Sequence, residues 1–203
     1  MLVLNPNSVN PFEPVRDEML TRAKVPMTKE EVRWVSVARL GVQPGDTVWD
    51  VGAGTGAVTF ELARKAMDGA VFAVERNTEA IELIAQNRQK LGGFNVHIVQ
   101  GHAPEVLADL PKPHCVFVGG SGGNMREIIE AALMKNPKAR IAVNSIALET
   151  LQETQRLFAE FGLQQVEITQ LSAARGKSIG CYTMMTANNP VFILSGKGAK
   201  YGE

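Results

Sequence analysis

Three glycines lie close together in the segment Asp50-Val51-Gly52-Ala53-Gly54-Thr55-Gly56. Because glycine has no Cβ, such a loop adopts positive φ without strain and lets a ligand approach the backbone closely. An apolar run typical of a strand precedes the loop and a helical pattern follows it, so free N–H groups at the beginning of that helix can also bind a ligand. The pattern predicts a cofactor-binding loop formed by Gly52, Ala53, Gly54, Thr55 and Gly56.

Two carboxylates near this loop indicate which cofactor it binds. Asp50 precedes the first glycine by two residues, where it would repel a pyrophosphate but attract the sulfonium and ammonium groups of S-adenosyl-L-methionine. Glu75 stands 19 residues after Gly56, at the expected end of the next strand, where an acidic side chain accepts hydrogen bonds from ribose hydroxyls. We therefore predict S-adenosyl-L-methionine as the cofactor, with Asp50 and Glu75 among its binding residues.

Each of these features also has a simpler interpretation. Read through Ala57, the loop satisfies the dinucleotide fingerprint G-x-G-x-x-A, so a nicotinamide-dependent dehydrogenase is an alternative. Asp50 alone could cap a loop, and Glu75 alone could be a solvated strand end. Their combination with the glycine loop and with the order of the strands and helices favours S-adenosyl-L-methionine.

The turn Gly101-His102-Ala103-Pro104 follows the third expected strand, where methyltransferases usually hold the adenine ring. Backbone groups of His102 and Ala103 can bind the edge of the ring whatever the side chain is. An acidic residue is common at the position of His102. Its side chain therefore leaves two interpretations open, a hydrogen bond to the adenine amino group or exposure to solvent.

A second glycine-rich loop, Gly119-Gly120-Ser121-Gly122-Gly123, follows the fourth expected strand. Its glycines allow a close approach of the backbone, and the helix expected after it adds free N–H groups, so the loop can bind an anion. Such a loop can also be a flexible connection without special chemistry. We predict that Gly120, Ser121 and Gly122 contact the substrate.

These loops need a scaffold in which strands and helices alternate. Apolar runs typical of buried strands alternate with helical patterns, which predicts a Rossmann-like α/β fold with a mostly parallel seven-stranded sheet and helices on both faces. Ligands bind at the carboxyl ends of the strands of such sheets. The last two strands lack a helix between them and suggest an antiparallel pair at one edge. The expected strands are 47–51, 70–75, 96–100, 115–118, 140–144, 164–174 and 189–195, and the expected helices are 29–40, 58–67, 78–91, 105–110, 124–134 and 148–161.

Residues 1–27 carry four prolines, which disfavour regular structure. We expect this extension to be either a substrate lid or a disordered tail. Thr28 and Glu31 then have the spacing of a capping box at the start of the first helix. Residues 28–203 have a length that suits one hydrophobic core and are predicted to form a single domain.

The chain has 203 residues with 21 basic and 21 acidic side chains, so its net charge is zero. It has no overall attraction for nucleic acid, and no apolar run is long enough to cross a membrane, which favours a cytoplasmic protein. Cys115 and Cys181 lie in apolar surroundings without CxxC spacing, so we expect reduced residues in or near the core. His97, His102, His114 and Cys115 match no metal-binding pattern, and no metal site is predicted.

Taken in order, these motifs resemble the decarboxylating methyltransferases of the cobalamin pathway that act on cobalt-precorrin-6B. The resemblance covers about residues 25–196, nearly the whole chain. Many methyltransferases share the glycine loop, and G-H-A-P-E at 101–105 and A-R-G-K at 174–177 match as well. The most specific combination is P-M-T-K-E-E-V-R at 26–33, V-G-G-S-G-G at 118–123 and N-P-V at 189–191.

The resemblance implies methyl transfer to carbon 15 of the tetrapyrrole, coupled to loss of the ring C acetate as carbon dioxide. It also implies a homotetramer. The aerobic relatives join this enzyme to a carbon-5 methyltransferase in one polypeptide, so the resemblance further implies that this chain works with a separate carbon-5 methyltransferase. The family usually has an aspartate where this chain has His102. Carried over residue by residue, the cofactor would be bound by Thr28, Gly52, Ala53, Gly54, Thr55, Gly56, Glu75 and Ala103.

No general base is evident in the motifs, so the catalytic residues stay unassigned. An electron-rich tetrapyrrole carbon can attack the cofactor methyl group directly, and alignment then supplies most of the catalysis. Because a corrin precursor carries many carboxylates, we expect a basic rim formed by Lys29, Arg33, Arg175 and Lys177, each of which could instead lie on an ordinary solvated face. Two alternatives are a methyltransferase that acts on tRNA or protein, which the zero net charge disfavours, and a non-catalytic cofactor-binding subunit.

Overall fold

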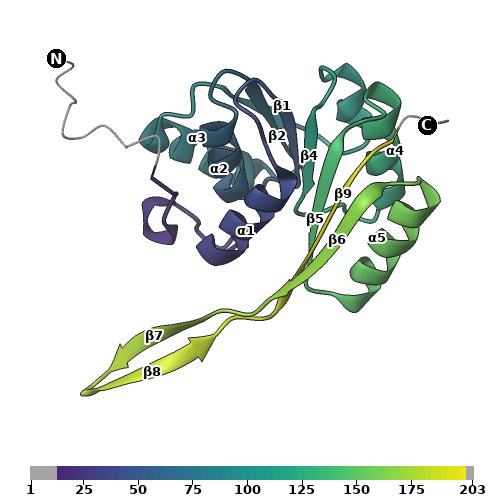
Figure 1. Ribbon diagram of the computed structural model, residues 1–203. Coiled ribbons are helices and arrows are strands. Elements are labelled where there is room, and N and C mark those ends of the chain that lie inside the picture. Colours follow the sequence, from purple (N-terminus) through teal and green to yellow (C-terminus); the bar gives the residue numbers. More distant parts are fainter. Residues whose placement is uncertain (1–12, 200–203) are drawn as a thin grey trace, which may run out of the picture.

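A seven-stranded sheet forms the centre of the protein, in the order β3-β2-β1-β4-β5-β9-β6. The computed structural model describes residues 13–199 (Figure 1). The first five strands of the chain run parallel, and β9 is antiparallel to both of its neighbours, which confirms the predicted Rossmann-like sheet with an antiparallel pair at one edge. The strands of the sheet are β1 (Thr47–Val51), β2 (Ala70–Glu75), β3 (Val96–Gln100), β4 (Cys115–Val118), β5 (Arg140–Ser145), β6 (Gln164–Leu171) and β9 (Val191–Lys197).

Helices cover both faces of the sheet (Figure 1). Val48 faces the core formed with the helices of one side, and the next residue, Trp49, faces the core formed with those of the other. Strands buried on both faces are apolar throughout, which made them recognisable in the sequence. Within residues 13–199, no helix combines the length and the apolar composition that crossing a membrane requires. The first side holds α1 (Glu30–Leu40), α2 (Ala57–Lys65) and α3 (Thr78–Leu91), and the second holds η2 (Glu105–Asp109), α4 (Met125–Lys135) and α5 (Leu148–Glu160).

Some helix boundaries differ from the prediction. Helix α2 spans Ala57–Lys65 rather than 58–67, and the helix expected at 105–110 is the 3-10 segment η2. The capping residue of α1 is Lys29 rather than Thr28, and no side chain makes a capping hydrogen bond there. The predicted capping box is wrong because the Glu31 carboxylate binds the Arg175 guanidinium instead.

The chain leaves the sheet after β6 and forms a two-stranded antiparallel ribbon, here called the arm, before it returns as β9 (Figure 1). The arm consists of β7 (Ala174–Ile179) and β8 (Tyr182–Ala187), and nearly all of its side chains are exposed. The arm was not predicted as a separate element. One strand was expected at 164–174, but β6 ends at Leu171 and the first strand of the arm begins at Ala174. Cys181 lies exposed at the tip of the arm, so its expected place near the core is wrong, whereas Cys115 is buried as predicted.

Residues 13–27, here called the strap, pack against the body although they contain only one short 3-10 turn, η1 (Asp17–Met19). Val15 is fully buried, and its N–H donates to the Glu61 carboxylate over 2.7 Å. The Thr21 N–H donates to Asn87 Oδ1 over 2.7 Å, and the amide nitrogen of this fully buried Asn87 donates to the carbonyl of Thr55. The strap is therefore tied to α2, α3 and the glycine loop. The rest of the predicted extension, residues 1–12, lies outside the described residues.

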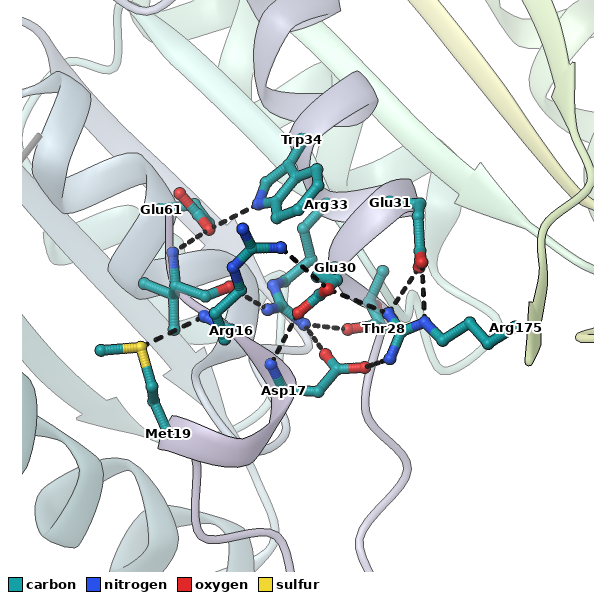
Figure 2. Close-up of polar contacts among 11 residues, drawn as sticks. Arg16, Asp17, Met19, Thr28, Glu30, Glu31, Arg33, Trp34, Glu61 and Arg175 are labelled. Atoms are coloured by element: carbon teal, nitrogen blue, oxygen red, sulfur yellow. Dashed lines mark hydrogen bonds and ion pairs between the residues drawn. The ribbon is translucent and has the colours of Figure 1, made fainter. Parts of the chain in front are cut away.

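An ion network connects the strap, α1 and the arm (Figure 2). Arg33 is fully buried, and its guanidinium donates to Asp17 Oδ1 and to the carbonyls of Val15 and Thr28, each over 2.6 Å. Arg175 donates to both oxygens of Glu31 over 2.7 Å and to Asp17 Oδ2 over 3.0 Å. The hydrogen bond from Arg175 lowers the pKa of Glu31. Asp17 thus bridges one arginine of the core and one of the arm.

Arg33→Met tests how much this network contributes to stability. The variant keeps an unbranched apolar chain but removes the donors to Asp17 and to two carbonyls, and breaking a buried ion pair costs about 3–5 kcal/mol. We expect a loss of that size in the free energy of unfolding, measured by urea denaturation. The control is Arg156→Met, which removes an exposed pair with Glu160 and should cost less than about 1 kcal/mol. Similar losses in both variants would contradict a structural role for Arg33.

Candidate functional site

A cavity of about 920 Å³ lies at the carboxyl ends of the parallel strands. The strand order changes direction between β1 and β4, which is where parallel α/β sheets bind their ligands. The volume is near the upper end of the range of about 300–1,000 Å³ for small-molecule sites. The cavity is lined by residues 24–29 before α1, by residues 50–55 at the end of β1 and after it, by residues 74–77 and 101–103, and by residues 117–122 and 144–147.

The two glycine loops meet at the centre of this cavity. A Cβ added to Gly52 would lie 2.6 Å from the carbonyl oxygen of Gly120, so the chains after β1 and β4 are in contact backbone to backbone. Gly54 has a φ of +56°, and a Cβ there would lie 3.4 Å from the carbonyl oxygen of Pro26 in the strap. Side chains at these positions would separate the loops or push the strap away, which explains why glycine occurs at both.

Glu75 holds the glycine loop against the beginning of α3. Its Oε2 accepts the Gly54 N–H over 2.8 Å, and its Oε1 accepts the N–H groups of Arg76 and Asn77 over 2.8 and 2.9 Å. The side chain is therefore fixed at the end of β2 and lines the cavity. One lone pair of Oε2 stays available and can accept a hydrogen bond from a hydroxyl group such as that of a ribose.

Asp50 is a buried carboxylate that is only partly satisfied. It is 1% exposed, and the Thr59 hydroxyl donates to its Oδ2 over 2.5 Å, whereas its Oδ1 has no hydrogen-bond partner within residues 13–199. Burial raises the pKa of Asp50 to about 7; the Thr59 hydrogen bond opposes this rise, and the charge of Glu75 adds to it. A buried carboxylate oxygen of this kind, in the wall of the cavity, suits a cationic group of a ligand. The sulfonium and ammonium groups of S-adenosyl-L-methionine therefore fit this site.

The structure brings nearly all the predicted cofactor residues to the cavity. Gly56 is the exception, because it caps the beginning of α2 and a Cβ there would lie 2.8 Å from the Phe60 ring. Its glycine serves the packing of α2 rather than the cavity wall. The predicted cofactor residues that line the cavity are Thr28, Asp50, Gly52, Ala53, Gly54, Thr55, Glu75, His102 and Ala103.

The turn after β3 is connected to both neighbouring loops. His102 Nε2 lies 3.5 Å from Arg76 Nη1, and the carbonyl of Ala103 accepts the side-chain amide of Asn124 over 2.9 Å. His102 is exposed and lines the cavity, so both interpretations of its ring stay open. The other histidines lie apart from the cavity: His97 stacks on Phe72, and His114 Nδ1 accepts the Thr47 N–H.

The expected basic rim needs correction. Lys29 lines the cavity together with Gly120, Ser121 and Gly122, but Arg33, Arg175 and Lys177 do not. Arg33 is buried beneath the strap, Arg175 is bound by Asp17 and Glu31, and Lys177 lies on the exposed arm. The prediction failed for the two arginines because carboxylates distant in the sequence neutralise them.

Several residues of the cavity wall were not predicted. Residues 144–147 form the end of β5 and the turn after it, and the rule that ligands bind at strand ends could have identified them, as it did for the loops after β1 and β4. Arg76 follows Glu75 directly and could have been found in the same way. Residues 24–27 and the pair Asn188 and Asn189 reach the cavity only through the packing of the strap and the base of the arm, which has no local signal.

A sheet of this order, with a glycine loop after β1 and an acid at the end of β2, defines a Rossmann-like class I methyltransferase. More particularly, the chain belongs to the family of the precorrin methyltransferase domain, whose model matches residues 21–197.

Relatives and solved structures agree with this assignment. The chain is 43% identical over 184 residues to a probable cobalt-precorrin-6B C(15)-methyltransferase (decarboxylating) of Pyrobaculum calidifontis, covering 89% of this chain and 94% of that one. It is similar to the structure of precorrin 8W decarboxylase from Methanobacterium thermoautotrophicum, with a TM-score of 0.84, 38% identity, and coverage of 91% and 100%. It also resembles the C-terminal domain of precorrin-6Y C5,15-methyltransferase from Rhodobacter capsulatus, with a TM-score of 0.77, 27% identity, and coverage of 93% and 100%.

Asp50→Asn tests the buried carboxylate, because asparagine keeps an acceptor for Thr59 but carries no charge. Since burial favours protonated Asp50, its contribution to stability is lost as the pH rises from the unfolded pKa of about 4 to the folded pKa of about 7. We expect the variant without cofactor to become more stable relative to the wild type between pH 5 and pH 8, by roughly 2–3 kcal/mol in urea unfolding.

The same variant should bind S-adenosyl-L-methionine more weakly in calorimetric titrations. The affinity of the wild type should increase through pH 7 as Asp50 ionises, and that of the variant should not. A stability difference that does not change with pH would contradict the raised pKa, and an unchanged affinity would contradict the contact with the cofactor.

Proposed function

We propose that this protein transfers the methyl group of S-adenosyl-L-methionine to carbon 15 of cobalt-precorrin-6B and releases the ring C acetate as carbon dioxide, in cobalamin biosynthesis. The observation that carries the proposal is a single cavity in which Asp50 and Glu75 suit this cofactor, within a chain that belongs to the precorrin methyltransferase family. The relative from Pyrobaculum calidifontis bears the name of this activity. The alternatives of a tRNA or protein methyltransferase, a dehydrogenase and a non-catalytic subunit have no such support.

The cofactor, when bound, supplies an electrophilic methyl group on a sulfonium that leaves readily. In the proposed arrangement Glu75 accepts a hydrogen bond from a ribose hydroxyl, Asp50 faces the cationic groups, and the backbone at Ala103 binds the adenine edge. Thr28, Gly52, Ala53, Gly54 and Thr55 complete this half of the site. The protein residues thus mainly orient the reacting groups, which is worth several kcal/mol in a direct transfer.

The substrate occupies the other half of the cavity in this proposal. The electron pair of carbon 15 forms the new bond to the methyl carbon while the carbon–sulfur bond breaks, and the electrons of the departing carboxylate then enter the conjugated ring. Lys29 and the loop at Gly120, Ser121 and Gly122 bind carboxylates of the tetrapyrrole, and so does Lys24 of the strap. Residues 28–203 form the catalytic domain, and the strap acts as its lid. A cytoplasmic location also stays a prediction.

We propose further that the protein is a homotetramer and that the arm forms its subunit contacts. A two-stranded ribbon exposed on both faces is only marginally stable in water, so a partner surface is needed. The register of the arm gives one uncharged face, which carries Ala174, Gly176, Ser178, Thr183, Met185 and Ala187. The number of four subunits rests on the family resemblance.

A carbon-5 methyltransferase is the expected partner enzyme. The structural relative from Rhodobacter capsulatus is the C-terminal domain of a C5,15-methyltransferase, so in that protein a domain of this kind is joined to a further part. We propose that the present chain works with a separate carbon-5 enzyme.

Calorimetric titration with S-adenosylhomocysteine is the first test of this function. We expect micromolar binding by the wild type and a loss in Gly54→Val, where a β-branched side chain meets a positive φ and the strap. Glu75→Ala should weaken binding by roughly tenfold to a hundredfold, since charge-assisted hydrogen bonds contribute about 1.5–3 kcal/mol each. Methyl incorporation and carbon dioxide release from cobalt-precorrin-6B are measured next. A folded wild type that does not bind the nucleoside would overturn the proposal.

Met185→Glu tests the arm, because it places a charge in the middle of the uncharged face. We expect the wild type to sediment with the mass of four chains and the variant to dissociate into smaller species. The matched control is Met134→Glu on α4, where the methionine is 78% exposed, against 68% for Met185. The arm is not the subunit contact if both variants keep the mass of the wild type.

A further inference from the structure

Arg76 occupies a place between the two halves of the cavity. Its backbone N–H is held by Glu75, and its side chain extends over the loop after β4: a Cβ added to Gly122 would lie 3.4 Å from Arg76 Nη1. The same Nη1 is 3.5 Å from His102 Nε2 on the turn after β3. The guanidinium therefore lies in the cavity wall between His102, on the turn expected to bind adenine, and Gly122, on the loop predicted to bind the substrate.

The guanidinium of Arg76 has no carboxylate partner among residues 13–199. Within the part of the chain that the structure describes, no carboxylate oxygen lies within 4.0 Å of its guanidinium, whereas Arg33 and Arg140 each pair with one carboxylate and Arg175 with three. Among residues 13–199, the one side chain with a polar contact to this guanidinium is His102, whose Nε2 lies 3.5 Å from Arg76 Nη1. A ligand group facing Arg76 therefore meets an available cation.

The neighbouring loop adds donors at the same place. The N–H groups of Gly119 and Gly120 bind the Val51 carbonyl, and that of Gly123 binds the Ser121 hydroxyl. Those of Ser121 and Gly122 make no hydrogen bond to any described residue. Both residues line the cavity just before the N-terminus of α4, whose dipole also favours an anion.

We propose that Arg76 and the N–H groups of Ser121 and Gly122 bind one carboxylate of the tetrapyrrole and so orient the ring over the cofactor. The inference rests on the proposed function and adds a specificity residue to it. A guanidinium presents two parallel N–H donors that match the two oxygens of a carboxylate, which the single ammonium of a lysine does not. Arg76 acts by orienting the substrate; it takes no part in bond making.

The test compares Arg76→Met and Arg76→Lys with the control Arg156→Met, which removes an exposed arginine of α5 outside the cavity lining. Each protein is first titrated with S-adenosylhomocysteine. We expect all variants to bind it like the wild type, which also shows that they are folded. A parallel loss of this affinity in Arg76→Met would overturn the proposal, because Arg76 would then hold the cofactor.

Binding of cobalt-precorrin-6B to the S-adenosylhomocysteine complex is then followed by the absorbance of the tetrapyrrole. Loss of a charge-assisted carboxylate contact is expected to weaken binding by roughly tenfold to a hundredfold in Arg76→Met, with a smaller loss in Arg76→Lys and none in the control. In turnover, KM for the tetrapyrrole should rise by a similar factor while kcat changes less.

The two proposals fail in different ways. If the wild type binds cobalt-precorrin-6B and Arg76→Met binds it equally well, the role of Arg76 is wrong and the proposed function stands. If the wild type binds the nucleoside but not the tetrapyrrole, the proposed substrate is wrong and the inference about Arg76 falls with it.

Discussion

The close contact between the backbones of Gly52 and Gly120 is the constraint on which the site depends. A Cβ added to Gly52 would lie only 2.6 Å from the Gly120 oxygen, so the loops after β1 and β4 share one wall without any side chain between them. This contact lies between β1 and β4, where the strand order reverses, so the two halves of the cavity meet there. A methyl donor and its acceptor can therefore be held next to each other by parts of the chain that are themselves in contact.

Charge is separated within this cavity, although the net charge of the chain is zero. The buried carboxylate of Asp50 and the half-buried one of Glu75 lie on the side of the glycine loop. Three cations, Lys24, Lys29 and Arg76, also line the cavity, where Lys24 and Arg76 are exposed, as is Glu79. A cationic cofactor and a substrate with many carboxylates are attracted to different regions of one site, which global composition cannot reveal.

The sequence predicted the parts of the site that depend on local patterns. Strand ends are visible as apolar runs followed by glycine or an acid, so Asp50, Gly54 and Glu75 could be placed at the cavity before any coordinates. The environment of an arginine depends instead on residues far away: Asp17 is separated from Arg33 by 16 residues and from Arg175 by 158. The arm was missed for a related reason. Its strands lie outside the core, so they do not carry the alternation of apolar and polar residues from which strands are recognised.

The position of β9 has a consequence for the way the chain assembles. This last strand inserts between β5 and β6, and β6 pairs with no other strand of the described chain. Synthesis proceeds from the N-terminus, so β1 to β5 are complete before β9 is made. The edge of β5 therefore stays unpaired while β6 and both strands of the arm are synthesised. An open edge of this kind invites pairing with other chains. The last strand, Val191–Lys197, therefore covers the open edge of β5 and joins β6 to the sheet, and its pairing also fixes the base of the arm.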